Sequence, residues 1–536
     1  MLLRRLAFFT ILLLTAAGMT VLVWRALEPG GWTVVKALIV ACFLGVAPWL
    51  GVCAGNGVLG FLVLVLARRP ARCVLPVRGD IDGQAISART ALLVTVRNED
   101  LSEVLPPLGQ LMAGLDPAQF TACILSDTQD ALLVAREAAA IAACGFAPRY
   151  RRRLENSGFK AGNVMEFLDH HAEGFEFAVV LDADSRMSAE AVRRLVRIMQ
   201  AAPGMGIVQH LTAGLPAAAA FPRLFQFGTR AGMRVWAVGQ AVWQGDCGPY
   251  WGHNAILRIA PFRAHARLAP LPDGSVILSH DQVEAAQLSA AGWGVCVWAD
   301  DDGSYEANPP ALPEFLRRDA RWQAGNLQYR HLLVRPGFRA MGRWQLLQAI
   351  LLFSGAPLYV AMFVLAVLAA CTAPAGYPRD RLTVLAVAWL LVIYAPKLLG
   401  YVETLAFTER KGRYGGAVQF LAGAAMEFLF SLLLDAPSLV SKTLALGVPG
   451  RWLPQNRGDR GVGWGEAVRL FWPHTLFGVV GFAVLAWVAP AIIFWALPFA
   501  GGLLVSIPFC VVTAAPGFSL WLRQRGIAAM PEERLS

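Results

Sequence analysis

Long apolar runs are the dominant pattern along this chain of 536 residues. A transmembrane α-helix needs about 20 mainly apolar residues. Runs that approach or exceed this length lie at residues 6–24, 34–66, 346–371, 382–406, 418–446, 470–488 and 491–514. The stretch between the second and third runs contains nothing comparable. The pattern therefore predicts membrane helices in both the N-terminal and the C-terminal parts of the chain, with a globular insert between them.

Short apolar segments alternate with amphipathic segments inside the insert. Residues 91–96, 121–125 and 177–181 are apolar runs of strand length, and segments of helical length separate them. This alternation is typical of a parallel sheet with crossover helices. We therefore expect N-terminal membrane helices at 1–66, an α/β domain at 67–345, a C-terminal membrane region at 346–514 and a tail at 515–536.

Composition and charge placement favour a membrane protein whose insert and tail are cytoplasmic. The chain is 56% hydrophobic and 16% charged, and its mean hydropathy is +0.50, which is too apolar for an ordinary soluble protein. Basic residues favour the cytoplasmic side of short loops, and Arg4, Arg5, Arg68, Arg69 and Arg72 flank the first two runs. The net charge of +10 lies largely beside membrane segments. It favours anionic lipid over nucleic acid as a partner.

The run at 418–446 contains Glu427, Asp435 and Pro437. A single crossing here would place the arginine-rich stretch 451–469 and the tail outside the cytoplasm. A re-entrant or double-crossing hairpin keeps both inside, so we expect a hairpin. Glu427 would then be a solvated residue at the hairpin tip or the membrane interface.

Acidic side chains follow the predicted strands. Asp127 comes directly after the second strand, and Asp182 and Asp184 follow the third in the stretch "VVLDADS". Because ligands bind beyond the carboxyl ends of parallel strands, we expect these acids to share a pocket. Carboxylates held together repel one another, and Mg²⁺ or Mn²⁺ would relieve that repulsion. Acids after a strand are also common as turn or helix caps.

Two further segments add charged groups to this picture. Lys160 lies in "NSGFKAGN", whose glycines permit close backbone approach and whose cation suits a diphosphate. Asp281 opens an amphipathic segment in "ILSHDQVEAAQL", with His280 and Glu284 beside it. Such dense groups of titratable residues occur in active-site clefts, although Asp281 could also be a plain helix cap.

A third segment, "RRDARWQAGNLQY", carries Arg318, Arg321 and Trp322 shortly before the chain re-enters the predicted membrane region. Arginine and tryptophan at such a position could be interfacial anchors. The order of Asp127, "KAGN", "DAD", "SHD" and this Arg-x-x-Arg-Trp resembles the processive family 2 glycosyltransferases, which include the cellulose synthases. That resemblance implies a GT-A-like cytoplasmic domain inserted between membrane helices.

Finer agreement is carried by eight blocks in order. The chain resembles the glucans biosynthesis glucosyltransferase H family in "NSGFKAGN", "VVLDADSRM", "RLFQFGTR", "WGHNAILR", "ILSHDQVEAA", "GSYEANPP", "RDARWQAGNLQY" and "DRGVGWGEA". The resemblance implies an inner-membrane enzyme that uses UDP-glucose to build the linear β-1,2-glucan backbone of osmoregulated periplasmic glucans and moves it across the membrane. The sequence starts almost at its first apolar run, so we expect no counterpart of the long N-terminal extension of some enterobacterial members.

The resemblance also implies roles for individual residues. Asp127 would recognise uridine, Lys160 the diphosphate and Asp182 the nucleotide, while Asp184, with Asp182, would hold Mg²⁺ or Mn²⁺. Asp281 would be the catalytic base. Arg321 and Trp322 would hold the pyrophosphate and the acceptor sugar, and Arg318 occupies the position of a glutamine in the cellulose synthases.

Two weaker assignments follow from the same resemblance. His253 and Asn254 in "WGHN" would contact the acceptor end of the growing glucan chain. Gln455 and Arg457, together with Arg460, lie in a loop near 449–467 that would gate the nucleotide site. Membrane lipid is an expected partner, and acyl carrier protein and periplasmic glucan-processing proteins remain open as partners.

Two other functions fit parts of the pattern. The first is another family 2 polysaccharide synthase, making cellulose or a β-1,3-glucan, because the catalytic acids do not determine linkage. The second is a nucleotide-gated transporter without turnover. The combination of strand-end acids, Asp281 and Arg321-Trp322 argues against the transporter.

Overall fold

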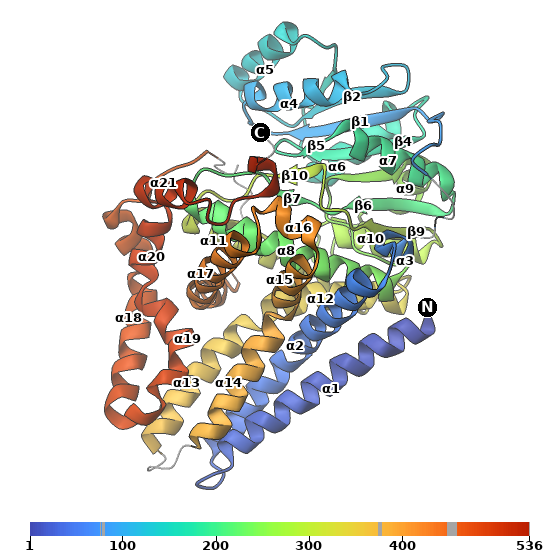
Figure 1. The fold of residues 1–536 in the computed structure, drawn as a ribbon. Coiled ribbons are helices and arrows are strands. Elements are labelled where there is room, and N and C mark those ends of the chain that lie inside the picture. The colour runs from blue at the N-terminus through green and yellow to red at the C-terminus, as the bar shows by residue number, and fades with distance from the viewer. Residues whose placement is uncertain (76, 78–80, 373–377, 448–457, 535–536) are drawn as a thin grey trace.

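The structure is a computed structural model that describes residues 1–75, 77, 81–372, 378–447 and 458–534. An α/β domain lies against a set of long apolar helices (Figure 1). Five helical stretches in the described part are long and apolar enough to cross a membrane: Leu2–Leu27 (α1), Val34–Leu66 (α2), Ala340–Thr372 (α12, Ala340–Ser354, with α13, Ala356–Thr372), Ala417–Leu444 (α17) and Trp464–Val488 (α18).

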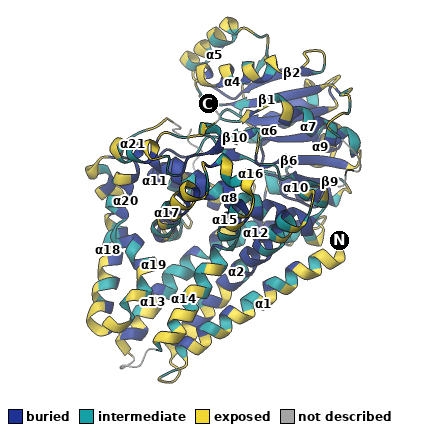
Figure 2. Ribbon diagram, in the orientation of Figure 1, coloured by how far each residue is buried: buried dark blue, intermediate teal, exposed yellow. Residues whose placement is uncertain are grey.

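Two bent pairs of helices also pass this test when each pair is taken together. Arg379–Ile393 (α14) and Ala395–Ala406 (α15) meet at 70°, and Pro490–Leu504, which contains α19 (Ile493–Leu504), meets Ser506–Thr513 (α20) at 57°. The seven apolar runs of the sequence lie on these helices and pairs. Their outward faces carry exposed apolar side chains, such as Leu14, Val387 and Trp487 (Figure 2). Apolar surface of this extent indicates a membrane protein.

The hairpin expected at 418–446 is wrong, because α17 is one continuous helix. Its two acids have partners on α15 or directly before it, which the local sequence does not reveal. The Glu427 side chain is only 1% exposed and pairs with Lys397 at 2.5 Å, so Glu427 is not solvated. Asp435 accepts a hydrogen bond from Tyr394.

Both ends of α17 nevertheless lie beside the α/β domain. Near its start, the ring of Phe420 is 5.4 Å from that of Phe227. Near its end, Lys442 Nζ lies 3.0 Å from Asp319 Oδ2. The helix therefore runs along the domain, and the chain that follows it begins on the domain side without a hairpin.

The main sheet has seven strands in the order β3-β2-β1-β4-β8-β6-β9. β1 pairs in parallel with β2 and β4, as expected, whereas β8 is antiparallel to β4 and β6, so the sheet is mixed. The strands are β1 (Thr90–Val96), β2 (Phe120–Ser126), β3 (Arg149–Arg152), β4 (Phe177–Asp182), β6 (Met205–His210), β8 (Ala255–Arg258) and β9 (Gly294–Trp298). Together with the covering helices, this sheet forms the α/β domain of GT-A-like type.

Helices cover both faces of the sheet because the central strands are apolar on both sides. Leu92 of β1 packs in one core cluster with the helices α4 (Leu101–Ala113) and α7 (Ala189–Ala201). Leu93, the next residue, belongs to the opposite cluster with α6 (Phe159–His170) and α10 (Asp281–Ala290). Alternation of this kind follows from the two-residue period of a strand. Other helices include α3 (Pro70–Val74), α5 (Ala131–Ala143), α9 (Ile259–His265) and α21 (Pro516–Gln524).

The helix α8 (Ala220–Gln244) joins the α/β domain to the membrane helices. Its backbone touches that of α2 at a pair of glycines. A Cβ atom added to Gly239 would lie 2.0 Å from the carbonyl oxygen of Asn56, and one added to Gly60 would lie 1.9 Å from that of Val235. The two parts of the chain therefore meet through backbone contact, which leaves no room for a side chain.

Candidate active site

A cavity of about 270 Å³ lies at the carboxyl ends of β1, β2 and β4. Segments far apart in the sequence meet there, including the start of α6, the loop before α10 and the helix α11 (Leu312–Gln328). Nine of the predicted site residues line the cavity: Asp127, Lys160, Asp182, Asp184, His253, Asp281, Arg318, Arg321 and Trp322.

The two acids of "DAD" follow directly from the strand. Asp182 is the last residue of β4, and its backbone N–H donates to Ser185 Oγ at 3.0 Å. Lys160, in the first turn of α6, pairs with the Asp182 carboxylate and donates to the carbonyl oxygen of Gly252 at 2.7 Å. The turn before α6 uses Gly158 at φ +70°, a conformation that suits glycine. The lysine is thereby held beside the acids, where it could face a diphosphate.

Asp127 is fixed by an arginine that sequence reasoning missed. Arg153 Nε and Nη2 donate to the two carboxylate oxygens of Asp127 at 2.5 and 2.8 Å. The same guanidinium donates to the carbonyl oxygens of Ser157 (2.9 Å) and Phe159 (2.6 Å). Asp127 therefore organises the "NSGFKAGN" loop as well as lining the cavity. Arg153 lies in an arginine-rich stretch, but its partner lies 26 residues away.

Asp281 opens α10 at the cavity wall. Ser279 Oγ donates to Asp281 Oδ1 at 3.0 Å. His280 Nδ1 lies 2.8 Å from Glu284 Oε2. Burial alone would lower the pKa of His280, but the Glu284 carboxylate outweighs burial and raises it. The expected group of titratable residues, His280, Asp281 and Glu284, is therefore present. The backbone of Gly252, at φ +82°, passes close to the first two of them.

The helix α11 presents the Arg-x-x-Arg-Trp residues to the cavity. The guanidinium carbon of Arg318 lies 4.5 Å from the centre of the Trp322 ring. Arg318 is buried, and burial lowers the pKa of its guanidinium. Its Nε has no hydrogen-bond partner among the described residues. An unsatisfied buried donor that faces a cavity is suited to an anionic or hydroxylated ligand.

Glu306 is a cavity residue that the sequence analysis did not assign. It ends β10 (Ser304–Glu306), and its carboxylate lies 3.3 Å from His253 Nε2. Burial raises the pKa of Glu306, and the nearby acids Asp184 and Asp182 raise it further, whereas His253 lowers it. Glu306 lies in "GSYEANPP", one of the eight sequence blocks that carry the family resemblance. That resemblance was the signal in the sequence that could have identified this residue.

Asn254 does not line the cavity. Its side chain is fully buried and donates to Ser304 Oγ at 3.0 Å and to the Tyr305 carbonyl oxygen at 3.2 Å. It is one of the few non-glycine residues with positive φ, at +49°. Asn254 therefore shapes the turn that presents His253 rather than facing the acceptor itself.

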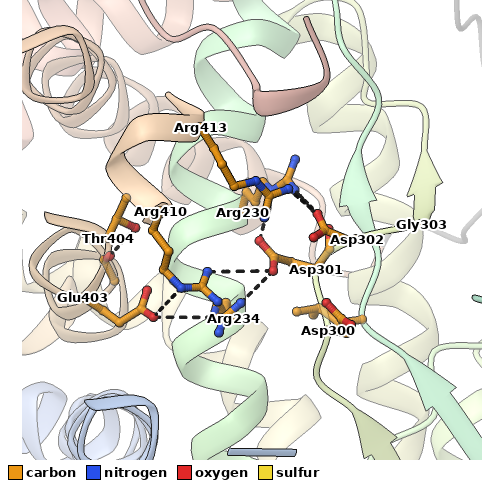
Figure 3. A network of polar contacts seen from close by, with 12 residues as sticks. Arg230, Arg234, Asp300, Asp301, Asp302, Gly303, Glu403, Thr404, Arg410 and Arg413 are labelled. Carbon is orange, nitrogen blue, oxygen red and sulfur yellow. Dashed lines mark hydrogen bonds and ion pairs between the residues drawn. The ribbon is translucent and has the colours of Figure 1, made fainter. Parts of the chain in front are cut away.

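The donor set in the cavity fits a divalent metal. Asp182, Asp184 and Glu306 supply carboxylate oxygens within electrostatic reach of one another, and hard oxygen ligands suit Mg²⁺ and Mn²⁺. A second acidic group, at residues 300–302, has carboxylate atoms within 4.8 Å of one another. Arginines already pair with Asp301 and Asp302 (Figure 3), and Arg194 lies 3.4 Å from Asp300, so the cavity is the better metal site.

Gln455 and Arg457 lie outside the described residues. Arg460 is described, and it bridges two acids away from the cavity. Its guanidinium nitrogens lie 2.8 Å from Glu314 Oε1 on α11 and 2.9 Å from Glu466 Oε1 on α18. This residue therefore holds α11 against a membrane helix.

Residues 177–401 match the model of the glycosyl transferase family group 2. A glucans biosynthesis glucosyltransferase H of Pseudomonas putida is 34% identical over 525 residues, covering 90% of this chain and 60% of that protein. One of Bradyrhizobium diazoefficiens is 32% identical over 567 residues, covering 99% of this chain and 74% of that protein. The fold, the cavity and these matches define a membrane-associated family 2 glycosyltransferase.

The chain belongs to the glucans biosynthesis glucosyltransferase H family, and the resemblance predicted from its motif blocks is confirmed. It spans about 60% of the length of the Pseudomonas relatives that it matches. Among solved structures, a mannosyltransferase of Pyrobaculum calidifontis in complex with GDP-Man and Mn²⁺ is 15% identical, with a TM-score of 0.44, and covers 66% of this chain and 98% of that one.

Proposed function

We propose that the protein is a processive, inverting glucosyltransferase of the bacterial inner membrane. It uses UDP-glucose to build the linear β-1,2-glucan backbone of osmoregulated periplasmic glucans and moves the product across the membrane. One observation carries the proposal: Asp127, Asp184 and Asp281 come from distant segments yet line the same cavity. Family membership supports the choice of glucose and of this product.

The charged residues of the cavity have complementary roles in this reaction. Negative charge builds on the leaving UDP as its bond to glucose lengthens, and Lys160 and Arg321 stabilise that charge. Asp184 and Asp182, with Glu306 beside them, would hold Mg²⁺ or Mn²⁺, which would neutralise charge on the diphosphate. Asp127 faces the uridine end and keeps the "NSGFKAGN" loop in place through Arg153.

Asp281 acts as the general base. Ser279 orients its carboxylate, which takes the proton from the attacking acceptor hydroxyl. A single base opposite the leaving group gives one displacement with inversion, so α-linked UDP-glucose yields a β-linkage. Trp322, which is 46% exposed, offers a ring face on which the acceptor sugar stacks. Arg318 and His253 supply hydrogen bonds to sugar hydroxyls or phosphate.

The test is synthesis by the purified full chain in lipid nanodiscs. The protein is incubated with UDP-glucose and Mg²⁺, released UDP is measured, and the glucan is subjected to linkage analysis. We expect a β-1,2-linked product that disappears in Asp281→Asn. Asp273→Asn is the matched control, because Asp273 is an exposed acid whose side chain contacts Ser275 in a nearby loop.

Other products would identify the rival functions. A β-1,4- or β-1,3-linked polymer would indicate another family 2 polysaccharide synthase, and an α-linked product would refute the inverting mechanism. Binding of the nucleotide without any formation of UDP from UDP-glucose would indicate a nucleotide-gated transporter.

A further inference from the structure

A buried network of ion pairs is formed by residues that do not line the cavity (Figure 3). Its centre is the loop between β9 and β10. Arg234 and Arg230 of α8 contact the Asp301 carboxylate at 2.7 and 3.2 Å. Asp302 is contacted by Arg230 at 3.1 Å and by Arg413 of α16 (Thr408–Arg413) at 2.5 Å.

The network is nearly closed to solvent at its centre. The Arg230 side chain is 1% exposed and that of Asp301 is 8% exposed. Burial alone would raise the pKa of Asp301, but Arg234 and Arg230 lower it, so this carboxylate stays ionised. Buried charges are costly unless all of them are paired. Such a network restricts the loop to one geometry, in which each charge keeps its partner.

The C-terminal segment joins this network. The short helix η3 (Pro531–Arg534), dark red in Figure 1, lies beside β10. Glu532 accepts a hydrogen bond from Arg230 at 2.6 Å and another from the Tyr305 hydroxyl at 3.1 Å. Its neighbour Glu533 instead accepts one from Arg223 at 2.6 Å. Glu532 is therefore the tail acid that touches β10.

β10 borders the cavity in two ways. Its last residue, Glu306, lines the cavity. Its middle residue, Tyr305, pairs antiparallel with Arg186 of β5 (Arg186–Met187), which begins two residues after Asp184. A shift of β10 would therefore move Glu306 directly and Asp184 through β5. Both carboxylates belong to the donor set assigned above to a divalent metal.

We propose that Glu532 is a positioning residue for the nucleotide-sugar site. Through Arg230 and Tyr305 it holds β10, and thereby Glu306 and Asp184, in the geometry that binds the divalent cation and the diphosphate. Glu532 contacts neither substrate nor metal, and the tail thus completes a site built elsewhere in the chain. The inference rests on the proposed function of that site.

The experiment uses the full chain in nanodiscs and measures Mn²⁺-dependent UDP binding by calorimetry, beside UDP release as a function of Mn²⁺ concentration. Glu532→Gln and Tyr305→Phe each weaken the support of the carboxylates. We expect the Mn²⁺ concentration for half-maximal rate to rise about tenfold, the lower range seen for outer-shell partners of metal ligands. kcat at saturating Mn²⁺ should stay close to that of the unaltered chain. The double variant should show no more than the larger single effect, because both changes break one shared contact.

Glu533→Gln is the matched control, since it removes the adjacent tail charge without touching β10. Its Mn²⁺ requirement should be unchanged. If Glu532→Gln fails to fold, Tyr305→Phe still tests the contact by removing only a hydroxyl group. A loss of kcat in Glu532→Gln or Tyr305→Phe with an unchanged Mn²⁺ requirement would overturn this inference but not the proposed function. An equal shift of the Mn²⁺ requirement in Glu533→Gln would have the same consequence. No turnover of UDP-glucose by the unaltered chain would overturn the proposed function and this inference together.

Discussion

Arg153→Met is expected to destabilise the α/β domain strongly. The Arg153 and Asp127 side chains are only 4% and 6% exposed, and two hydrogen bonds join them. Methionine keeps the apolar stem but leaves the buried Asp127 carboxylate without its cation. Removal of one partner of a buried pair costs about 3–5 kcal/mol in the free energy of unfolding. At about 2–4 °C per kcal/mol for a domain of this size, Tm should fall by roughly 6–20 °C.

The assay is thermal unfolding of the solubilised full chain, followed by tryptophan fluorescence. Arg152→Met is the control, because Arg152 is the neighbouring residue at the end of β3 and its side chain donates a long hydrogen bond of 3.3 Å to the Thr128 carbonyl oxygen. The double variant Arg153→Met with Asp127→Leu should recover much of the lost Tm, because an apolar pair can replace a buried ion pair. Equal Tm values for Arg153→Met and Arg152→Met would refute the reasoning.

Three further predictions concern other parts of the molecule. Glu284 raises the pKa of the buried His280. The pair therefore stabilises the fold fully below the unfolded histidine pKa of about 6.5, and this stabilisation is lost as the pH rises through the folded pKa. In His280→Gln the fall of Tm over this pH range should be flatter, and an unchanged pH dependence of Tm would contradict the prediction. Gly239→Ala should disrupt the α2–α8 contact and lower Tm by several degrees, whereas Gly18→Ala, where a Cβ meets nothing within 4 Å, should not. Glu427→Gln should lower Tm, because the half-buried Lys397 loses its counter-charge; a Tm equal to that of the unaltered chain would show that the pair is dispensable.

Much of the fold and cavity could be predicted because it depends on local patterns. Apolar runs identify the long helices, and acids after apolar strands fall at one edge of the sheet whatever the details of packing. Asp127 and Asp184 therefore line one cavity as expected, and Asp281 joins them from the start of α10. The resemblance supplied the order of the motifs, which periodicity alone does not give.

The errors and omissions share a physical cause, since each depends on a partner far away in the sequence. Glu427 suggested a break in its helix because the lysine that neutralises it lies 30 residues earlier on another helix. Arg153 and Glu306 acquire their roles only when separate loops meet. The contact between Glu532 and Arg230 joins residues 302 positions apart, and no local pattern marks it.

The central claim is that distant acids of the α/β domain form one metal-dependent UDP-glucose site. The most direct test measures nucleotide binding and sugar transfer separately in the same variants. UDP binding to the full chain is measured by calorimetry with and without Mn²⁺, beside UDP-glucose turnover. We predict that Asp184→Asn loses the Mn²⁺-dependent part of binding together with turnover, while Asp281→Asn keeps binding and loses turnover. Mn²⁺-dependent binding and turnover that survive unchanged in both variants would contradict the account.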